Sequence, residues 1–112
     1  MIDNIARIAF TVALLAAACF PGAAQQGASV SISVKSHHFE PVEIHAPAKV
    51  PIELHVKNLD PTPMEFESVS LRVEKIVTGN SEGIVRLRPL EPGRYNFFDD
   101  FHQETNGVLV VR

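Results

Sequence analysis

Apolar and polar residues alternate with a period of two along most of the chain after residue 28. In the first such segment Val30, Ile32 and Val34 alternate with serines. Successive side chains of a strand point to opposite faces, so this pattern is typical of half-buried β-strands. Prolines and glycines separate the segments, as turn residues do. The pattern predicts an all-β chain of about seven strands, at residues 29–34, 42–46, 50–57, 71–76, 85–88, 95–97 and 108–111.

Two of these segments depart from simple alternation. In 71–76 the apolar positions change parity between Val73 and Ile76, which predicts a β-bulge near Glu74 or Lys75. Segment 108–111 is apolar on both faces, which suits a strand in the middle of a sheet. Strands of this length and pattern indicate an antiparallel sandwich of two sheets around one core.

The first 24 residues have a different composition from the rest. Arg7 precedes an apolar run over 8–19, and Ala23 and Ala24 supply small residues after it. This is the pattern of a secretory signal peptide. As a helix the run would be about 18 Å long, against about 30 Å for a bilayer core. The sequence therefore predicts a signal peptide at 1–24 and one exported domain at 25–112.

Cys19 is the single cysteine of the chain, and it lies inside that leader. Lipid attachment at Cys19 is the alternative to removal, but Ala16 stands where a leucine is usual, and a soluble domain is favoured. Cleavage after Ala24 would leave no thiol for a disulfide or a metal.

The 112 residues carry 10 Lys and Arg against 13 Asp and Glu, which gives a net charge of -3. A weakly acidic chain offers no basic surface for nucleic acid or an anionic membrane.

The clearest candidate for chemistry is the run Phe97-Phe98-Asp99-Asp100-Phe101-His102. Phe97 and Asp99 share a strand face, and because Phe97 must face the core, Asp99 is expected to point inward. A buried carboxylate needs a cation, hydrogen bonds or a proton. His102 can converge with Asp99 if the chain turns there. In the alternative interpretation Asp99 only caps the turn through main-chain amides. Parity excludes an inward Asp100 on a regular strand, which predicts a sharp turn or a second, more exposed site.

A second candidate is Met64-Glu65-Phe66-Glu67. An extended chain puts Glu65 and Glu67 on one side, where two like charges repel each other unless a cation lies between them. An ordinary solvated acidic edge is the alternative. Surface positions are expected for the remaining histidines, which are His37, His38, His45 and His55. The adjacent His37 and His38 could alternatively bind adventitious metal.

These residues resemble the cupredoxins. The pattern from Gly93 to His102, followed by Gly107 and a last strand, is similar to the cupredoxin segment Gly-x-Tyr-x-Phe-x-Cys-x-x-His. In that alignment Asp99 occupies the thiolate position and His102 that of the following histidine, while Met64 or Glu65 replaces the first histidine. The resemblance implies a Greek-key β-sandwich without a blue type 1 copper centre, since that centre needs a thiolate and two imidazoles.

A finer resemblance is to the EfeO-type cupredoxin-like domain, carried by Phe39-Glu40-Pro41, Met64-Glu65-Phe66-Glu67-Ser68 and the Phe-Phe-Asp-Asp-Phe-His run. It implies a periplasmic protein that binds iron or copper and hands the metal to an iron permease or other membrane-bound uptake component. The implied metal ligands are Met64, Glu65, Glu67, Asp99, Asp100 and His102. The alternatives are a ferroxidase-like enzyme that oxidises Fe²⁺ before uptake, a copper-binding periplasmic protein and a metal-free adaptor.

Overall fold

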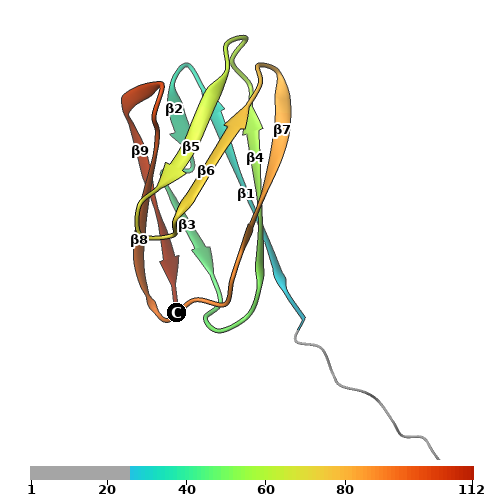
Figure 1. The fold of residues 1–112 in the computed structure, drawn as a ribbon, viewed down its shortest axis with the longest axis vertical. Helices are drawn as coiled ribbons and strands as arrows, with labels where there is room; N and C mark the ends of the chain where they lie inside the picture. Colours follow the sequence, from blue (N-terminus) through green and yellow to red (C-terminus); the bar gives the residue numbers. More distant parts are fainter. Residues whose placement is uncertain (1–25) are drawn as a thin grey trace, which may run out of the picture.

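Residues 26–112 are described by the structure, a computed structural model (Figure 1). The predicted signal peptide and Cys19 lie outside the described residues. Within that range the structure contains no helix with the length and apolar character needed to cross a membrane.

The described residues form a sandwich of two β-sheets, which confirms the predicted all-β fold. One sheet has four strands in the order β2-β1-β4-β7, and the other has five in the order β3-β9-β8-β5-β6. Two strands more than the predicted seven are present, because the three-residue β2 and the glutamate-bearing β5 were not counted. The strands are β1 Ala28–Lys35, β2 His38–Glu40, β3 Glu43–Ala46, β4 Ile52–Asn58, β5 Met64–Ser68, β6 Val73–Val77, β7 Ser81–Leu87, β8 Gly93–Asp99 and β9 His102–Val111.

The sandwich is mixed and not purely antiparallel as predicted. Strand β1 runs parallel to β4, and β3 runs parallel to β9. The physical reason is the change of sheet between β2 and β3, which are separated by Pro41 and Val42 and belong to different sheets. As predicted, the last strand is central: β9 lies between β3 and β8, and residues 107–111 are buried on both faces.

The predicted bulge near Glu74 or Lys75 is wrong. Strand β6 pairs with β5 in unbroken register from Met64↔Val77 to Ser68↔Val73. The apparent parity change arises because Leu71 is buried in the turn before β6, while Ile76 is 56% exposed on the outer face. A register shift does occur between Phe98 and Asp99, at the end of β8.

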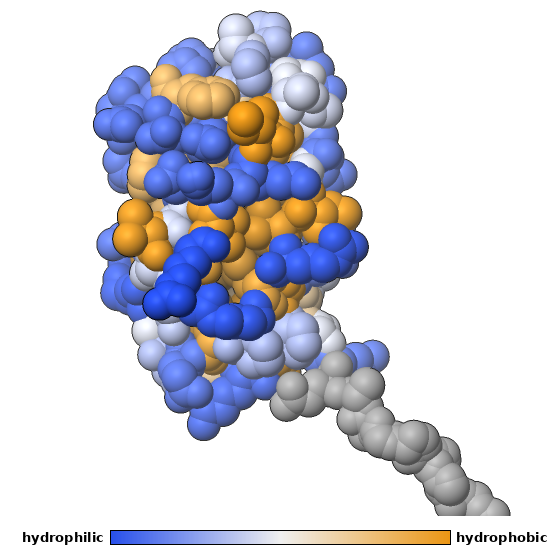
Figure 2. Space-filling view, in the orientation of Figure 1, coloured by the Kyte–Doolittle hydropathy of each residue, from blue (hydrophilic) through white to orange (hydrophobic). Residues whose placement is uncertain are grey.

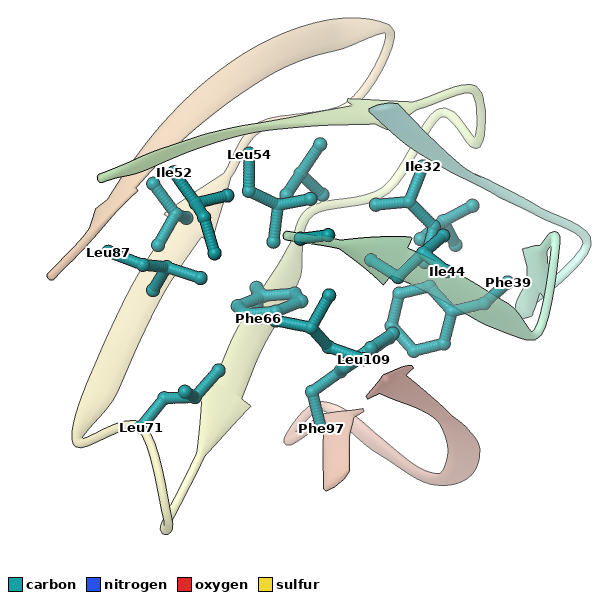
Figure 3. Close-up of a cluster of buried hydrophobic side chains, with 14 of the residues drawn as sticks. Ile32, Phe39, Ile44, Ile52, Leu54, Phe66, Leu71, Leu87, Phe97 and Leu109 are labelled. Carbon is teal, nitrogen blue, oxygen red and sulfur yellow. The ribbon is translucent and has the colours of Figure 1, made fainter. Parts of the chain in front are cut away.

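Apolar side chains from both sheets fill the space between them (Figure 3). Phe39, Phe66 and Phe97 form its aromatic centre: Phe66 stacks on Phe97 at 5.0 Å, and Phe39 meets Phe97 edge-on at 4.9 Å. Burying each such ring contributes about 1.5–3 kcal/mol. The few buried polar residues all lie near the sheet ends or at turns; they are Asn58, Ser68, Asp99 and Thr105.

Candidate metal site

Four connections meet at one end of the sandwich, at the top of Figure 1: β1–β2, β4–β5, β6–β7 and β8–β9. Strand β8 ends there with Asp99, which is fully buried. Its inward direction follows from the parity it shares with Phe97, as predicted. The Asp99 carboxylate therefore contacts residues that lie at this end of the sandwich.

Three donors satisfy the Asp99 carboxylate. The main-chain N–H groups of Glu65 and Phe101 donate to Oδ1, at 2.9 and 3.0 Å. Nδ1 of His102 lies 2.9 Å from Oδ2. A carboxylate only accepts hydrogen bonds, so Nδ1 of His102 carries the proton. Asp99 thus caps the turn and also orients an imidazole, which combines the two interpretations of the sequence.

A tight turn brings His102 back to Asp99. Asp100 and Phe101 form the turn, and Asp99 is the cross-strand partner of His102 in the β8–β9 register. The N–H of Asp100 donates to the carbonyl of Glu65 at 2.9 Å, so the main chain of Glu65 contacts both aspartates. The Asp100 side chain points to the opposite face from Asp99, as alternation requires, and reaches the more exposed outer face.

His37 is exposed, as predicted, and its ring stacks on that of His102. The ring centroids are 3.9 Å apart and the planes differ by 28°. Sixty-five residues separate the two in the chain, so no local sequence pattern signals the contact. Nδ1 of His37 lies 3.6 Å from Oδ2 of Asp60. Each of the two stacked rings therefore has a carboxylate near its Nδ1 atom.

Asp60 holds the β1–β2 turn in place. Its Oδ1 accepts from the N–H of Ser36 at 2.6 Å and its Oδ2 from the N–H of His37 at 3.0 Å. The His37 amide is the main reason why the pKa of Asp60 lies below the ordinary value of 3.8. Asn58 fixes the loop that carries Asp60, because its buried amide accepts from the Asp60 N–H and donates to three carbonyls of neighbouring segments.

A separate group of carboxylates lies on the outer face of the five-stranded sheet. Side-chain oxygens of Glu65, Glu67 and Asp100 all lie within 4.8 Å of one another, and all three residues are half-buried. Within residues 26–112 no salt bridge joins any of the three to a lysine or arginine. Glu74 faces Glu67 across β5 and β6 and adds a fourth negative charge. In Figure 2, which has the orientation of Figure 1, polar residues interrupt a hydrophobic area in the middle of the visible face.

The electrostatics of this group favour a proton or a cation. Burial raises the pKa of Glu65 above its ordinary value of 4.5, and a hydrogen bond with Asp100 and nearby negative charges add to the shift. Burial also raises the pKa of Glu67, followed by the charges of Asp100 and Glu74. Oxygens bound to one cation at about 2.0–2.5 Å lie at most about 4–5 Å apart, which is the spacing found here.

The six predicted ligands thus fall into three places. Glu65, Glu67 and Asp100 come together on the outer face, and Asp99 pairs with His102 at the end of the sandwich. Met64 is 1% exposed and belongs to the apolar core. The alternation of β5 produces this division, because Met64 and Phe66 point inward and the two glutamates point outward.

Of the other histidines, His45 is exposed beside Glu43, with 3.0 Å between Nε2 and a carboxylate oxygen. His55 is half-buried between Glu53 and Glu82, with 3.0 Å from one ring nitrogen to each carboxylate. Both contact carboxylates on strands β3, β4 and β7, away from the end where His102 lies. The predicted surface position is found for His45, whereas His55 is half-buried.

A family model described as the cupredoxin-like domain matches residues 7–111. The chain is 42% identical over 83 residues to the uncharacterized protein RP394 of Rickettsia prowazekii (strain Madrid E), which covers 73% of this chain and 66% of that protein. The chain thus spans just under two thirds of the length of that relative.

Solved structures share the fold at low sequence identity. The metal-binding domain of the Cu(I)-exporting P-type ATPase CopA of Streptococcus pneumoniae, in a structure with Cu(I), is 19% identical with a TM-score of 0.68, covering 75% of this chain and 84% of that one. Amicyanin of Paracoccus versutus is 14% identical with a TM-score of 0.60, covering 75% and 81%. A purple cupredoxin of Nitrosopumilus maritimus is 16% identical with a TM-score of 0.56, covering 74% and 99%.

Proposed function

The chain belongs to the cupredoxin-like domain family, and from this premise we propose that it is a periplasmic metal-binding module of iron acquisition. The outer carboxylates Glu65, Glu67 and Asp100 hold the cation. A membrane-bound iron permease or related uptake component receives the metal. Export by the predicted signal peptide and the resemblance to the EfeO-type domain support the compartment and the pathway.

The observation that carries this proposal is the carboxylate cluster itself. Two carboxylates of strand β5 and one of the β8–β9 turn meet within 4.8 Å, and none of them forms a salt bridge with a described lysine or arginine. Like charges at this spacing destabilise the fold. A bound cation would turn that repulsion into attraction, and this supports metal binding at the cluster.

The donor set favours a hard metal ion. All three groups offer oxygen, and carboxylate oxygens suit hard cations whereas thiolates and thioethers suit Cu(I). Anionic oxygens also stabilise Fe³⁺ more than Fe²⁺. The half-buried position on an open strand face leaves coordination positions free for water or for a receiving protein, which suits a site that must release its cargo.

The test is metal binding by the purified chain. Mn²⁺ is an air-stable hard probe, and Fe²⁺ can be added without oxygen. We expect one tightly bound Mn²⁺ or Fe²⁺ by calorimetry in the wild type and loss of that site in Glu65→Gln/Glu67→Gln. Glu91→Gln is the matched control, because Glu91 is exposed in the turn before β8 at the opposite end. Equal affinity in both variants would refute the assignment of the site.

The same protein distinguishes a binding module from a ferroxidase. Fe²⁺ in air should give at most one Fe³⁺ per chain if the domain only binds iron. Formation of many Fe³⁺ per chain, abolished by Glu65→Gln/Glu67→Gln, would instead show turnover at this cluster.

A further inference from the structure

The stacked imidazoles of His37 and His102 form a candidate metal-binding pair, separate from the carboxylates of the outer face. The two rings come from different sheets: His37 lies in the β1–β2 turn of the four-stranded sheet, and His102 is the first residue of β9 in the five-stranded sheet. Among the hydrogen bonds of residues 26–112, none uses Nε2 of either ring. His102 is partly exposed and His37 more so, with side-chain exposures of 29% and 45%.

The Asp99 carboxylate selects which ring atom of His102 remains for a ligand. Oδ2 of Asp99 accepts the proton of His102 Nδ1 at 2.9 Å, so the lone pair of His102 is on Nε2. Oδ2 of Asp60 lies 3.6 Å from Nδ1 of His37, beyond hydrogen-bond distance, so only the tautomer of His102 is fixed by a hydrogen bond to a carboxylate. Metal-binding histidines usually donate their other N–H to a carboxylate in this way, which fixes the ring and strengthens the ligand.

The backbone under His37 is the independent observation. Ser36 and His37 both have positive φ, 51° and 58°, and form the two-residue turn between Lys35 and His38. Such turns prefer Asn-Gly, because bulkier residues are strained there. The Asp60 carboxylate and the Thr105 hydroxyl, which donates to the His37 carbonyl, hold the strained turn. This turn places the His37 imidazole against that of His102.

We propose that Nε2 of His37 and Nε2 of His102 bind a borderline transition-metal ion, with Cu²⁺ as the best fit and water completing the coordination. Imidazole nitrogens suit copper, nickel and zinc, and divalent copper binds most strongly of these. The rings are stacked with 28° between their planes, so the exposed His37 ring must turn about its Cβ–Cγ bond and leave the stack to aim its lone pair at an ion shared with His102. This site differs from the hard-metal site in ligand type, in ligand atoms and in place.

The experiment is Cu²⁺ titration of the full chain, read by calorimetry and by pulsed electron paramagnetic resonance, which counts bound imidazoles. We expect two imidazoles on the first equivalent of Cu²⁺ in the wild type and one in His37→Asn. Asn tolerates the left-handed conformation of position 37, so this variant retains the turn. Losing a carboxylate behind a ligand costs 10–100-fold in affinity, so loss of the ligand itself should weaken binding by at least about tenfold.

His38→Asn is the matched control, because His38 is the adjacent exposed histidine, and it should retain both imidazoles. His102→Gln should also leave one imidazole, and if it fails to fold, His37→Asn decides alone. An unchanged imidazole count in His37→Asn, or a count that falls in His38→Asn, overturns the proposal and assigns the copper to ordinary surface histidines. Glu65→Gln/Glu67→Gln should bind Cu²⁺ as the wild type does, and His37→Asn should bind Mn²⁺ as the wild type does. The proposal for either site can therefore be refuted without affecting the proposal for the other.

Discussion

Replacing Asp99 tests how the buried carboxylate stabilises the end of the sandwich. Asp99→Ala removes the acceptor of three donors: the main-chain N–H groups of Glu65 and Phe101 and the Nδ1 of His102. Asp99→Asn has nearly the same shape and keeps an oxygen where Oδ1 was. The two variants therefore separate the loss of hydrogen bonds from the loss of charge.

The magnitudes follow from the exposure of each donor. The Glu65 N–H lies within strand β5, so leaving it unpaired costs about 1–3 kcal/mol. The Phe101 N–H sits in an exposed turn where water can replace the acceptor, and the His102 bond is charge-assisted and so about twice as strong as a neutral one. Asp99→Ala should lower the free energy of unfolding by about 3–5 kcal/mol in all. Asp99→Asn keeps the two amide bonds and should cost about 1–2 kcal/mol.

Urea unfolding of the metal-free protein measures both values. With an m-value of about 1–1.5 kcal/mol/M for a small domain, the midpoint should fall by about 2–5 M for Asp99→Ala and by about 0.7–2 M for Asp99→Asn. Nitrogen NMR adds a second readout: the wild type should carry its His102 proton on Nδ1, and Asp99→Asn should move it to Nε2, because the new amide donates. Equal destabilisation by the two variants, or a wild-type His102 protonated on Nε2 alone, would refute this account.

Three further predictions concern other parts of the fold. Asn58→Ala leaves three carbonyls and one amide without their partner and should lower the free energy of urea unfolding by about 2–4 kcal/mol. Gly107→Ala should cost about 1–3 kcal/mol in thermal unfolding, because a Cβ there would lie 2.7 Å from the Phe97 ring and 2.8 Å from the Val42 carbonyl. The raised pKa of Glu67 means that the folded protein binds this proton more tightly than the unfolded chain does, so stability falls as pH rises above 4.5. In chelating buffer, Glu67→Gln should therefore lose less thermal stability than the wild type between about pH 4 and about pH 7, and an identical pH profile would contradict this.

Much of this fold could be predicted from the sequence because alternation reports directly on which side chains are buried. It placed Phe97 and Asp99 on the inner face and the last strand in the middle of a sheet, and both are found. It failed where burial does not follow strand parity. Leu71 is buried from a turn, and Ile76 is exposed on an edge strand, so their spacing imitated a bulge that does not exist.

The candidate sites were less accessible to such reasoning. The pairing of Asp99 with His102 is local, three residues apart, and was foreseen. The division of Glu65 and Asp99 between two faces also follows from parity. The contact between His37 and His102 depends on the meeting of two distant connections, and the topology that brings them together includes parallel strand pairs that the alternation did not reveal. A histidine in a turn has no sequence signature that distinguishes a solvated ring from a stacked one.

The two sites are nevertheless joined by one residue. The N–H of Glu65 donates to the carboxylate of Asp99, and its carbonyl accepts from the N–H of Asp100, while its side chain belongs to the outer carboxylate cluster. The peptide groups of β5 therefore fix the position of the turn that carries both Asp100 and His102. A substitution that only removes the Glu65 carboxylate leaves these main-chain bonds intact, whereas one that bends β5 disturbs the outer cluster and the imidazole pair together. For this reason side-chain variants such as Glu65→Gln and His37→Asn can test the two sites independently, although the sites share a backbone.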